Sequence, residues 1–264
     1  MLCLHGFTGA PDAFEPVLSR LVGHRAVSPV LFGHGPSGDH DVARSFMEEV
    51  DRLAALVRTQ AGAGAMFTSP SSPGMTGSSR VQAASSGAGA ILVGYSLGAR
   101  FALGLVVRHP GLFARAVLIG GSAGLATENE RAARVASDEA WAARLEQNGL
   151  APFADAWAAQ PLFASQESLS REGRLREHSR RLSHTSAGLA ASLRLHGLGR
   201  MPDFSAALPD LDVPCTLVTG ELDAKFTALA ARQAQAIPGA RHVIVPGAGH
   251  NVLLERPDAV ARAL

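Results

Sequence analysis

Cysteine is scarce in this 264-residue chain, and long hydrophobic runs are absent. Cys3 and Cys215 both lie in apolar runs, which favours two buried reduced thiols over a disulfide framework. No apolar run approaches the length of a membrane span, and no basic stretch followed by a hydrophobic one marks a secretory signal. The net charge of +1 provides no basic surface for nucleic acid. We therefore expect a cytoplasmic protein without membrane or nucleic-acid partners.

Signatures of bound metals and cofactors are also missing. The ten histidines, including His5 and His34, lack the spacing of a metal site. Neither a dinucleotide fingerprint nor a phosphate-binding loop occurs. We therefore expect no metal and no cofactor, and we expect His5 and His34 to brace loops at the mouth of a site.

Alternating apolar runs and helical patterns organise most of the chain. A length of 264 residues suits one domain with a large core. The predicted strands cover residues 1–4, 26–32, 91–93, 113–119, 213–219 and 241–245. The predicted helices between them cover residues 12–22, 41–58 (capped by Asp41), 101–109 and 226–236, with a last helix from Pro257. This alternation predicts an α/β fold with a mostly parallel sheet covered on both faces.

Two stretches depart from this alternation. Residues 59–90 are mainly Ala, Gly, Ser, Pro and Thr, and too few large apolar side chains are present to offset the entropy of ordering them. We expect a disordered surface loop there. Residues 123–200 contain no predicted strand, and helical patterns cover 127–148, 150–159, 169–182 and 187–195. Thr127 and Glu130 form a capping box at the start of the first. We interpret 123–200 as a helical lid inserted in the single domain 1–264.

The segment from Gly94 to Gly98 has the Gly-x-Ser-x-Gly pattern of a nucleophile elbow. The pattern alone is weak, but here an apolar strand precedes it and a helix follows, as the motif requires. The turn is so tight that small residues are needed two positions either side of Ser96. Its hydroxyl is then presented near a helix N-terminus, where developing negative charge is stabilised.

Three candidate catalytic residues each follow a predicted strand, in the order Ser96, Asp223, His250. Ligands of open α/β sheets bind at the carboxyl ends of strands, and this order is that of an α/β-hydrolase triad. The histidine would accept the serine proton, and the aspartate would orient the imidazole. The backbone N–H groups of Leu97 and Phe7 are the candidate oxyanion hole.

Arg100 breaks a local rule. It places a cation in the first turn of the helix after Ser96, against the helix dipole. Such conflicts concentrate at functional sites. Arg100 is either a pocket residue or a solvated surface arginine, and the helix pattern alone leaves both open.

Five stretches of the chain resemble a known family of α/β-hydrolase-fold lyases, the 2-succinyl-6-hydroxy-2,4-cyclohexadiene-1-carboxylate synthases of menaquinone biosynthesis (the MenH family). They are residues 4–7, 94–100, 153–163, 220–226 and 248–251. The elbow and histidine stretches are shared with many hydrolases. The runs Trp157-x-x-Gln160-Pro161-x-Phe163 and Asp223-x-Lys225-Phe226 are far more specific. The two strands that precede the His-Gly-Phe strand in this family have no counterpart here, so we expect the first strands of the fold to be missing.

The resemblance implies a lyase that eliminates pyruvate from a small polycarboxylate. It places Arg100, Arg134 and Arg181 as ligands of the substrate carboxylates, for which bidentate guanidinium groups are suited. It also places Tyr95 and Trp157 in the pocket.

Other functions remain open from the residues alone. An esterase or carbon–carbon-bond hydrolase would use the same triad, and a receptor of this fold would bind a ligand without turnover. Several arginines at one pocket favour the lyase, because ester pockets are mostly apolar. We expect a monomer or a weak homo-oligomer.

Overall fold

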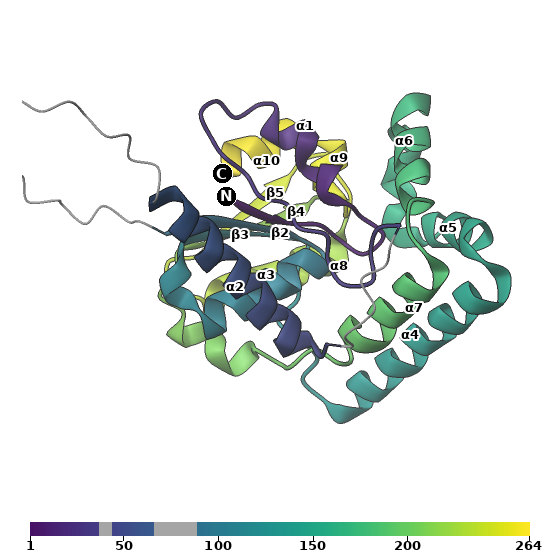
Figure 1. Ribbon diagram of the computed structural model, residues 1–264, viewed down its shortest axis with the longest axis horizontal. Coiled ribbons are helices and arrows are strands. Elements are labelled where there is room, and N and C mark those ends of the chain that lie inside the picture. Colours follow the sequence, from purple (N-terminus) through teal and green to yellow (C-terminus); the bar gives the residue numbers. More distant parts are fainter. Residues whose placement is uncertain (37–43, 66–88) are drawn as a thin grey trace, which may run out of the picture.

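A parallel β-sheet forms the centre of the computed structural model, which describes residues 1–36, 44–65 and 89–264. Its five strands, in spatial as well as sequence order, are β1 (Leu2–Leu4), β2 (Ala90–Tyr95), β3 (Phe113–Ile119), β4 (Cys215–Gly220) and β5 (Arg241–Val245). Every neighbouring pair is parallel. Helices cover both faces (Figure 1), so the predicted α/β class is confirmed.

Two apolar clusters hold helices on the two faces of the sheet. Successive strand residues point to opposite faces, so Leu92 belongs to one cluster and Val93 to the other. Phe46 and Phe101 stack in the first cluster with ring centroids 4.6 Å apart. The helices of that cluster are α2 (Phe46–Ala65), α3 (Leu97–Arg108) and α8 (Ala224–Ala236), and those of the other are α1 (Glu15–Leu18), α9 (Val252–Glu255) and α10 (Pro257–Ala263).

The strand predicted at 26–32 is wrong. Among the described residues, an isolated bridge between Leu2 and Val27 is the only pairing of this segment with the sheet. Pro29 has no N–H to donate and therefore interrupts a ladder. Val27 and Val30 are 37% and 45% exposed, so the segment also lacks the buried faces of a central strand.

The predicted helix at 41–58 and the predicted loop at 59–90 both need correction. The helix α2 begins at Phe46, and Ser45 and Glu48 exchange side-chain-to-backbone hydrogen bonds at its start. It continues to Ala65, so residues 59–65 are helical, and Ala90 already belongs to β2. Alanine, which occurs three times in residues 59–65, is the most favourable residue in a helix, and low hydrophobicity alone does not end one. The predicted cap Asp41 and the remaining loop positions 66–88 lie outside the described residues.

The stretch between β3 and β4 contains the predicted helices. They are α4 (Glu128–Asn148), α5 (Leu150–Ala158), α6 (Arg171–Arg181) and α7 (Ser186–His196), with a 3-10 helix η3 (Pro161–Ser168) that the sequence pattern did not predict. The capping box of Thr127 and Glu130 is formed. We call α4–α7 with η3 the helical insertion. It has a small apolar cluster of its own around Phe153 and stands to one side of the sheet (Figure 1).

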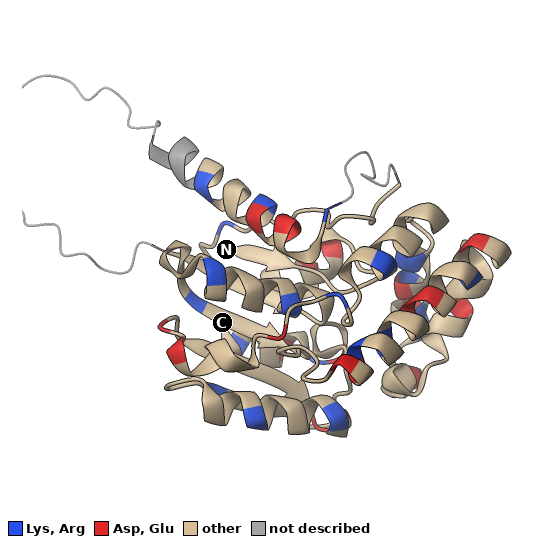
Figure 2. Cartoon of the chain, turned by 90° about the horizontal axis from the view of Figure 1, so that it is seen from below, with Lys and Arg blue, Asp and Glu red and all other residues tan. Residues whose placement is uncertain are grey.

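Charged residues of both signs cover the helical insertion, whereas the central strands carry few (Figure 2). Shorter 3-10 helices occur at η1 (Pro11–Phe14), η2 (Pro110–Leu112) and η4 (Ser205–Asp210). Within the described parts of the chain, no helix combines the length and the apolarity needed to cross a bilayer.

Candidate active site

The elbow sits where β2 ends and α3 begins. Ser96 has φ 52° and ψ −107°, a conformation unusual for a residue with a side chain. A Cβ at Gly94 would lie 2.3 Å from the carbonyl oxygen of Gly98, and a Cβ at Gly98 would lie 2.0 Å from that of Leu4. Only glycine fits at both positions. The backbone therefore turns tightly enough to place Ser96 directly before the first residue of α3.

Ser96, His250 and Asp223 form one hydrogen-bonded chain. His250 Nε2 lies 3.1 Å from Ser96 Oγ, and His250 Nδ1 lies 2.7 Å from Asp223 Oδ2. The other carboxylate oxygen of Asp223 accepts the N–H of Phe226 at 3.2 Å, as the N-cap of α8. His250 and Asp223 are buried, while Ser96 is half-buried. The carboxylate is thus held by the helix start and can hold the imidazole in one orientation.

The loop after β1 passes over the elbow. A Cβ at Gly6 would lie 2.8 Å from the ring of Tyr95 and 3.5 Å from Cβ of Ser96. Glycine therefore lets this backbone approach Ser96 closely. Phe7, the next residue, packs edge-on against Trp157 with ring centroids 5.0 Å apart. The loop carrying Phe7 thereby contacts both the elbow and the helical insertion.

One cavity of about 590 Å³ lies between the strand ends and the helical insertion. The ten residues proposed from the sequence come from seven separate stretches of the chain. All of them line this cavity: Phe7, Tyr95, Ser96, Leu97, Arg100, Arg134, Trp157, Arg181, Asp223 and His250.

Arg100 and Arg134 lie at one end of the cavity. Arg100 is a pocket residue, since its Nη1 donates to the carbonyl oxygen of His196 at 2.9 Å and it lines the cavity. Burial and the nearby Arg134 lower the pKa of Arg100 to about 9, so it remains cationic at pH 7. Arg134 pairs with Asp138 at 2.8 Å. Burial raises the pKa of Asp138, and its Oδ2 has no hydrogen-bond partner among the described residues.

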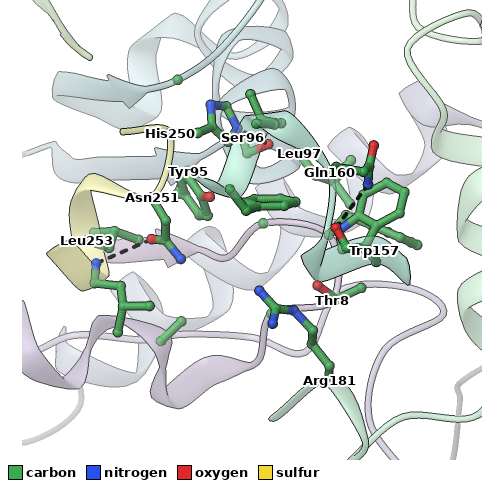
Figure 3. A pocket seen from close by; sticks show the side chains of 18 of the residues that line it. Thr8, Tyr95, Ser96, Leu97, Trp157, Gln160, Arg181, His250, Asn251 and Leu253 are labelled. Atoms are coloured by element: carbon green, nitrogen blue, oxygen red, sulfur yellow. Dashed lines mark hydrogen bonds between the residues drawn. The ribbon is translucent and has the colours of Figure 1, made fainter. Parts of the chain in front are cut away.

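Arg181 has hydrogen-bonding capacity to spare. It is 4% exposed, its Nη2 donates to Gln166 at 3.2 Å, and Glu177 lies 3.5 Å away. Its Nε has no hydrogen-bond partner within the described part of the chain. The adjacent Arg180 is instead bound by the carboxylates of Asp12 and Glu177. Figure 3 shows Arg181 across the cavity from Ser96.

Aromatic rings surround His250, the histidine hydrogen-bonded to Ser96 and Asp223. Phe226 and Tyr95 lie with ring centroids 4.5 Å and 5.5 Å from that of His250. Burial and nearby carboxylates raise the pKa of Tyr95 well above its ordinary value, so its hydroxyl stays protonated. Trp157 Nε1 is buried and has no hydrogen-bond partner among the described residues. The cavity therefore has polar groups, the hydroxyl of Tyr95 and Nε1 of Trp157, among its aromatic side chains.

Sequence reasoning assigned no role to several residues at the site. Gln160, Phe163, Lys225 and Phe226 line the cavity and lie in the two most specific runs of the resemblance, so a signal for them was present. Glu255 had no such signal. Its buried carboxylate accepts the N–H of Gly249, next to His250, at 2.7 Å and the hydroxyl of Ser165 at 3.0 Å. It thus connects the histidine loop to the helical insertion.

This fold, with its elbow and its hydrogen-bonded serine, histidine and aspartate, is that of an α/β hydrolase. Residues 1–263 match the model of the Alpha/beta hydrolase family, and the chain belongs to that family.

Within it, the chain belongs to the 2-succinyl-6-hydroxy-2,4-cyclohexadiene-1-carboxylate synthases. It is 32% identical to the synthase of Enterobacter sp. (strain 638), covering 100% of this chain and 89% of the relative. It is 30% identical to that of Pectobacterium atrosepticum, covering 99% and 90%. The structure of MenH from S. aureus shares the fold, with a TM-score of 0.85 at 24% identity over 99% of this chain and 90% of that one.

Proposed function

We propose that this protein eliminates pyruvate from 2-succinyl-5-enolpyruvyl-6-hydroxy-3-cyclohexene-1-carboxylate, a step of menaquinone biosynthesis. The product is 2-succinyl-6-hydroxy-2,4-cyclohexadiene-1-carboxylate, the compound named in its relatives. The protein is therefore a carbon–oxygen lyase on an α/β-hydrolase fold. Ser96, His250 and Asp223 are its proposed catalytic residues.

The observation that carries this proposal is the placement of cations around the serine. Arg100, Arg134 and Arg181 line the same cavity as Ser96, and Arg181 Nε is buried without a partner among the described residues. Buried donors that lack acceptors are costly, and a carboxylate satisfies guanidinium donors strongly. A substrate with several carboxylates supplies these acceptors, whereas a simple ester does not.

The reaction begins with the removal of a proton from carbon. His250 accepts the hydroxyl proton of Ser96, and Asp223 stabilises the imidazolium that forms. The Ser96 oxygen then takes the hydrogen from the ring carbon next to the succinyl ketone. The electron pair of that carbon–hydrogen bond moves toward the ketone oxygen, which the N–H groups of Phe7 and Leu97 stabilise as an oxyanion.

Elimination follows from this oxyanion. Its electrons return through the ring, a new carbon–carbon double bond forms, and the bond from the ring carbon to the enolpyruvyl oxygen breaks. Pyruvate leaves as its enolate and takes up one proton, which balances the one removed. The arginines contribute by holding the carboxylates so that the hydrogen faces Ser96. No bond between Ser96 and the substrate is required.

Pyruvate release from the enolpyruvyl substrate tests the reaction. The wild-type protein should form pyruvate and the cyclohexadiene product in equal amounts. Ser96→Ala should suppress kcat, and Asp223→Asn should lower it by about 10³- to 10⁴-fold, because the imidazole would be held in the wrong tautomer. A wild-type protein without pyruvate release would contradict the proposed reaction.

Intact-mass spectrometry on a quenched reaction tests the role of Ser96. As a base, the serine should remain unmodified during turnover. A substrate-derived adduct that forms and disappears at the turnover rate would instead show a covalent route, as in hydrolases.

A further inference from the structure

Three buried histidines from separate parts of the chain lie in a row beneath the loop that carries Phe7. His5 follows β1, His34 lies in the segment before α2, and His184 lies between α6 and α7 of the helical insertion. Their exposed fractions are 0%, 1% and 6%. The ring centroids of His5 and His34 are 4.9 Å apart, and those of His34 and His184 are 5.3 Å apart.

Both ring nitrogens of each histidine have a backbone partner, and those partners determine the tautomers. His34 Nε2 accepts the N–H of Thr8 at 3.2 Å, so its Nδ1 carries the hydrogen donated to the Phe32 carbonyl at 3.0 Å. His184 Nδ1 accepts the N–H of Gly35 at 2.9 Å, so its Nε2 donates to the carbonyl oxygen of Thr8 at 3.0 Å. Both rings are therefore neutral.

The backbone partners of His5 determine its tautomer in the same way. His5 Nε2 accepts the N–H of Leu31 at 3.3 Å, and its Nδ1 donates to the carbonyl oxygen of Gly6 at 2.9 Å. With every nitrogen engaged by backbone, the row has no lone pair left for a metal ion. No metal-binding cluster of histidine, cysteine or acidic residues occurs elsewhere in the described ranges either.

Thr8 is the residue on which two of these histidines converge. Its N–H is held by His34 and its carbonyl oxygen by His184, so the peptide groups on both sides of the residue are fixed. Thr8 has φ 61°, a left-handed conformation that is strained for a β-branched residue. Such a conformation persists only where surrounding contacts enforce it. Thr8 lines the cavity directly after Phe7 (Figure 3).

We propose that His184 is a positioning residue that ties the helical insertion to the loop of Gly6, Phe7 and Thr8 after β1, which we call the oxyanion loop. It holds Thr8 in its strained conformation and thereby aims the N–H of Phe7 at the reacting oxygen. The inference rests on the proposed function, in which Phe7 supplies that donor. His184 follows Arg181 by three residues. One short segment therefore carries both Arg181, which binds a substrate carboxylate in the proposed function, and His184, which holds the oxyanion loop. Substrate binding and oxyanion stabilisation are thus built on the same piece of the insertion.

Kinetics of two His184 variants test this role. His184→Ala removes the bond to Thr8, and we expect kcat to fall about 10- to 100-fold with KM changed less than about threefold, because a misplaced donor mainly affects the transition state. His184→Gln keeps an amide donor near the position of Nε2, so it should recover most of the loss in kcat. Equal falls in kcat for both variants would overturn the proposal.

A control variant, matched to His184→Ala, removes contacts within the helical insertion at a position away from the oxyanion loop. Arg194 on α7 pairs with Glu139 and Glu146 on α4, away from the cavity. Arg194→Ala should lower the thermal stability of the protein but leave kcat unchanged. If it lowered kcat as much as His184→Ala, the effect of His184 would be one of general stability and the proposal would be wrong.

Hydrogen–deuterium exchange gives a readout that does not depend on turnover. The peptide covering residues 5–9 should exchange faster in His184→Ala than in the wild type, and the Gln variant should restore the slower exchange. Unchanged exchange in the Ala variant would overturn the role of His184. Faster exchange in His184→Ala, in a protein whose wild type never releases pyruvate, would support the conclusion that His184 holds Thr8. It would contradict only the proposed reaction.

Discussion

Mild acid should destabilise this protein because its fold buries neutral histidines. Burial lowers the pKa of His5 to about 4 and that of His196 to about 4, from an ordinary value of 6.5. Burial also lowers the pKa of His34 and His184. Below pH 6.5 the unfolded chain binds protons at these positions and the folded chain does not. The free energy of unfolding therefore decreases as the pH is lowered.

The size of the effect follows from the two stated pKa values. Between pH 7 and pH 5, one histidine whose pKa falls from 6.5 to about 4 on folding costs about 2 kcal/mol of stability. His5 and His196 together cost about 4 kcal/mol, a large part of the 5–15 kcal/mol typical of a domain. Carboxyl groups with a lowered pKa, such as that of Asp51, contribute little to this loss, because in the unfolded chain they are also still mostly ionised at pH 5.

Urea unfolding followed by circular dichroism at pH 7 and pH 5 measures this loss. His5→Gln removes one titrating group, so its stability should fall by about 2 kcal/mol less than that of the wild type over the same interval. This comparison uses the difference between the two pH values, so any general destabilisation by the substitution cancels. The same loss in both proteins would refute the reasoning.

Two further predictions use matched pairs of substitutions. Gly98→Ala should destabilise the protein by about 3 kcal/mol or more, because its Cβ would lie 2.0 Å from a backbone oxygen. Gly111→Ala, where a Cβ meets nothing within 4 Å, should change stability by less than about 1 kcal/mol; similar values in urea unfolding would contradict the packing argument. Arg134→Ala should raise KM for the polycarboxylate about 10- to 100-fold by removing a charged hydrogen bond. Arg131→Ala, on the same helix but paired with an exposed glutamate, should leave KM unchanged; pyruvate release measures both.

Local rules were sufficient where a feature depends on neighbours in sequence. The strand before the elbow, the two glycines around Ser96 and the capping box at Thr127 could all be predicted, because each is decided within a few residues. The segment 26–32 shows the limit of such rules. It is apolar enough for a strand, but its pairing depends on a distant partner, and only a bridge at Val27 forms.

The sequence by itself determined the class of fold, the elbow and the order of the three candidate catalytic residues, since strand ends of a parallel sheet meet at one edge. Only the tertiary structure decided which groups meet there from segments far apart in the chain. It placed Arg100 in the cavity and left Nε of Arg181 without a hydrogen-bond partner among the residues that the structure describes. It also joined His184 to Thr8 across 176 positions. Such contacts depend on the packing of the helical insertion against the sheet, which no periodicity within a short stretch of sequence encodes.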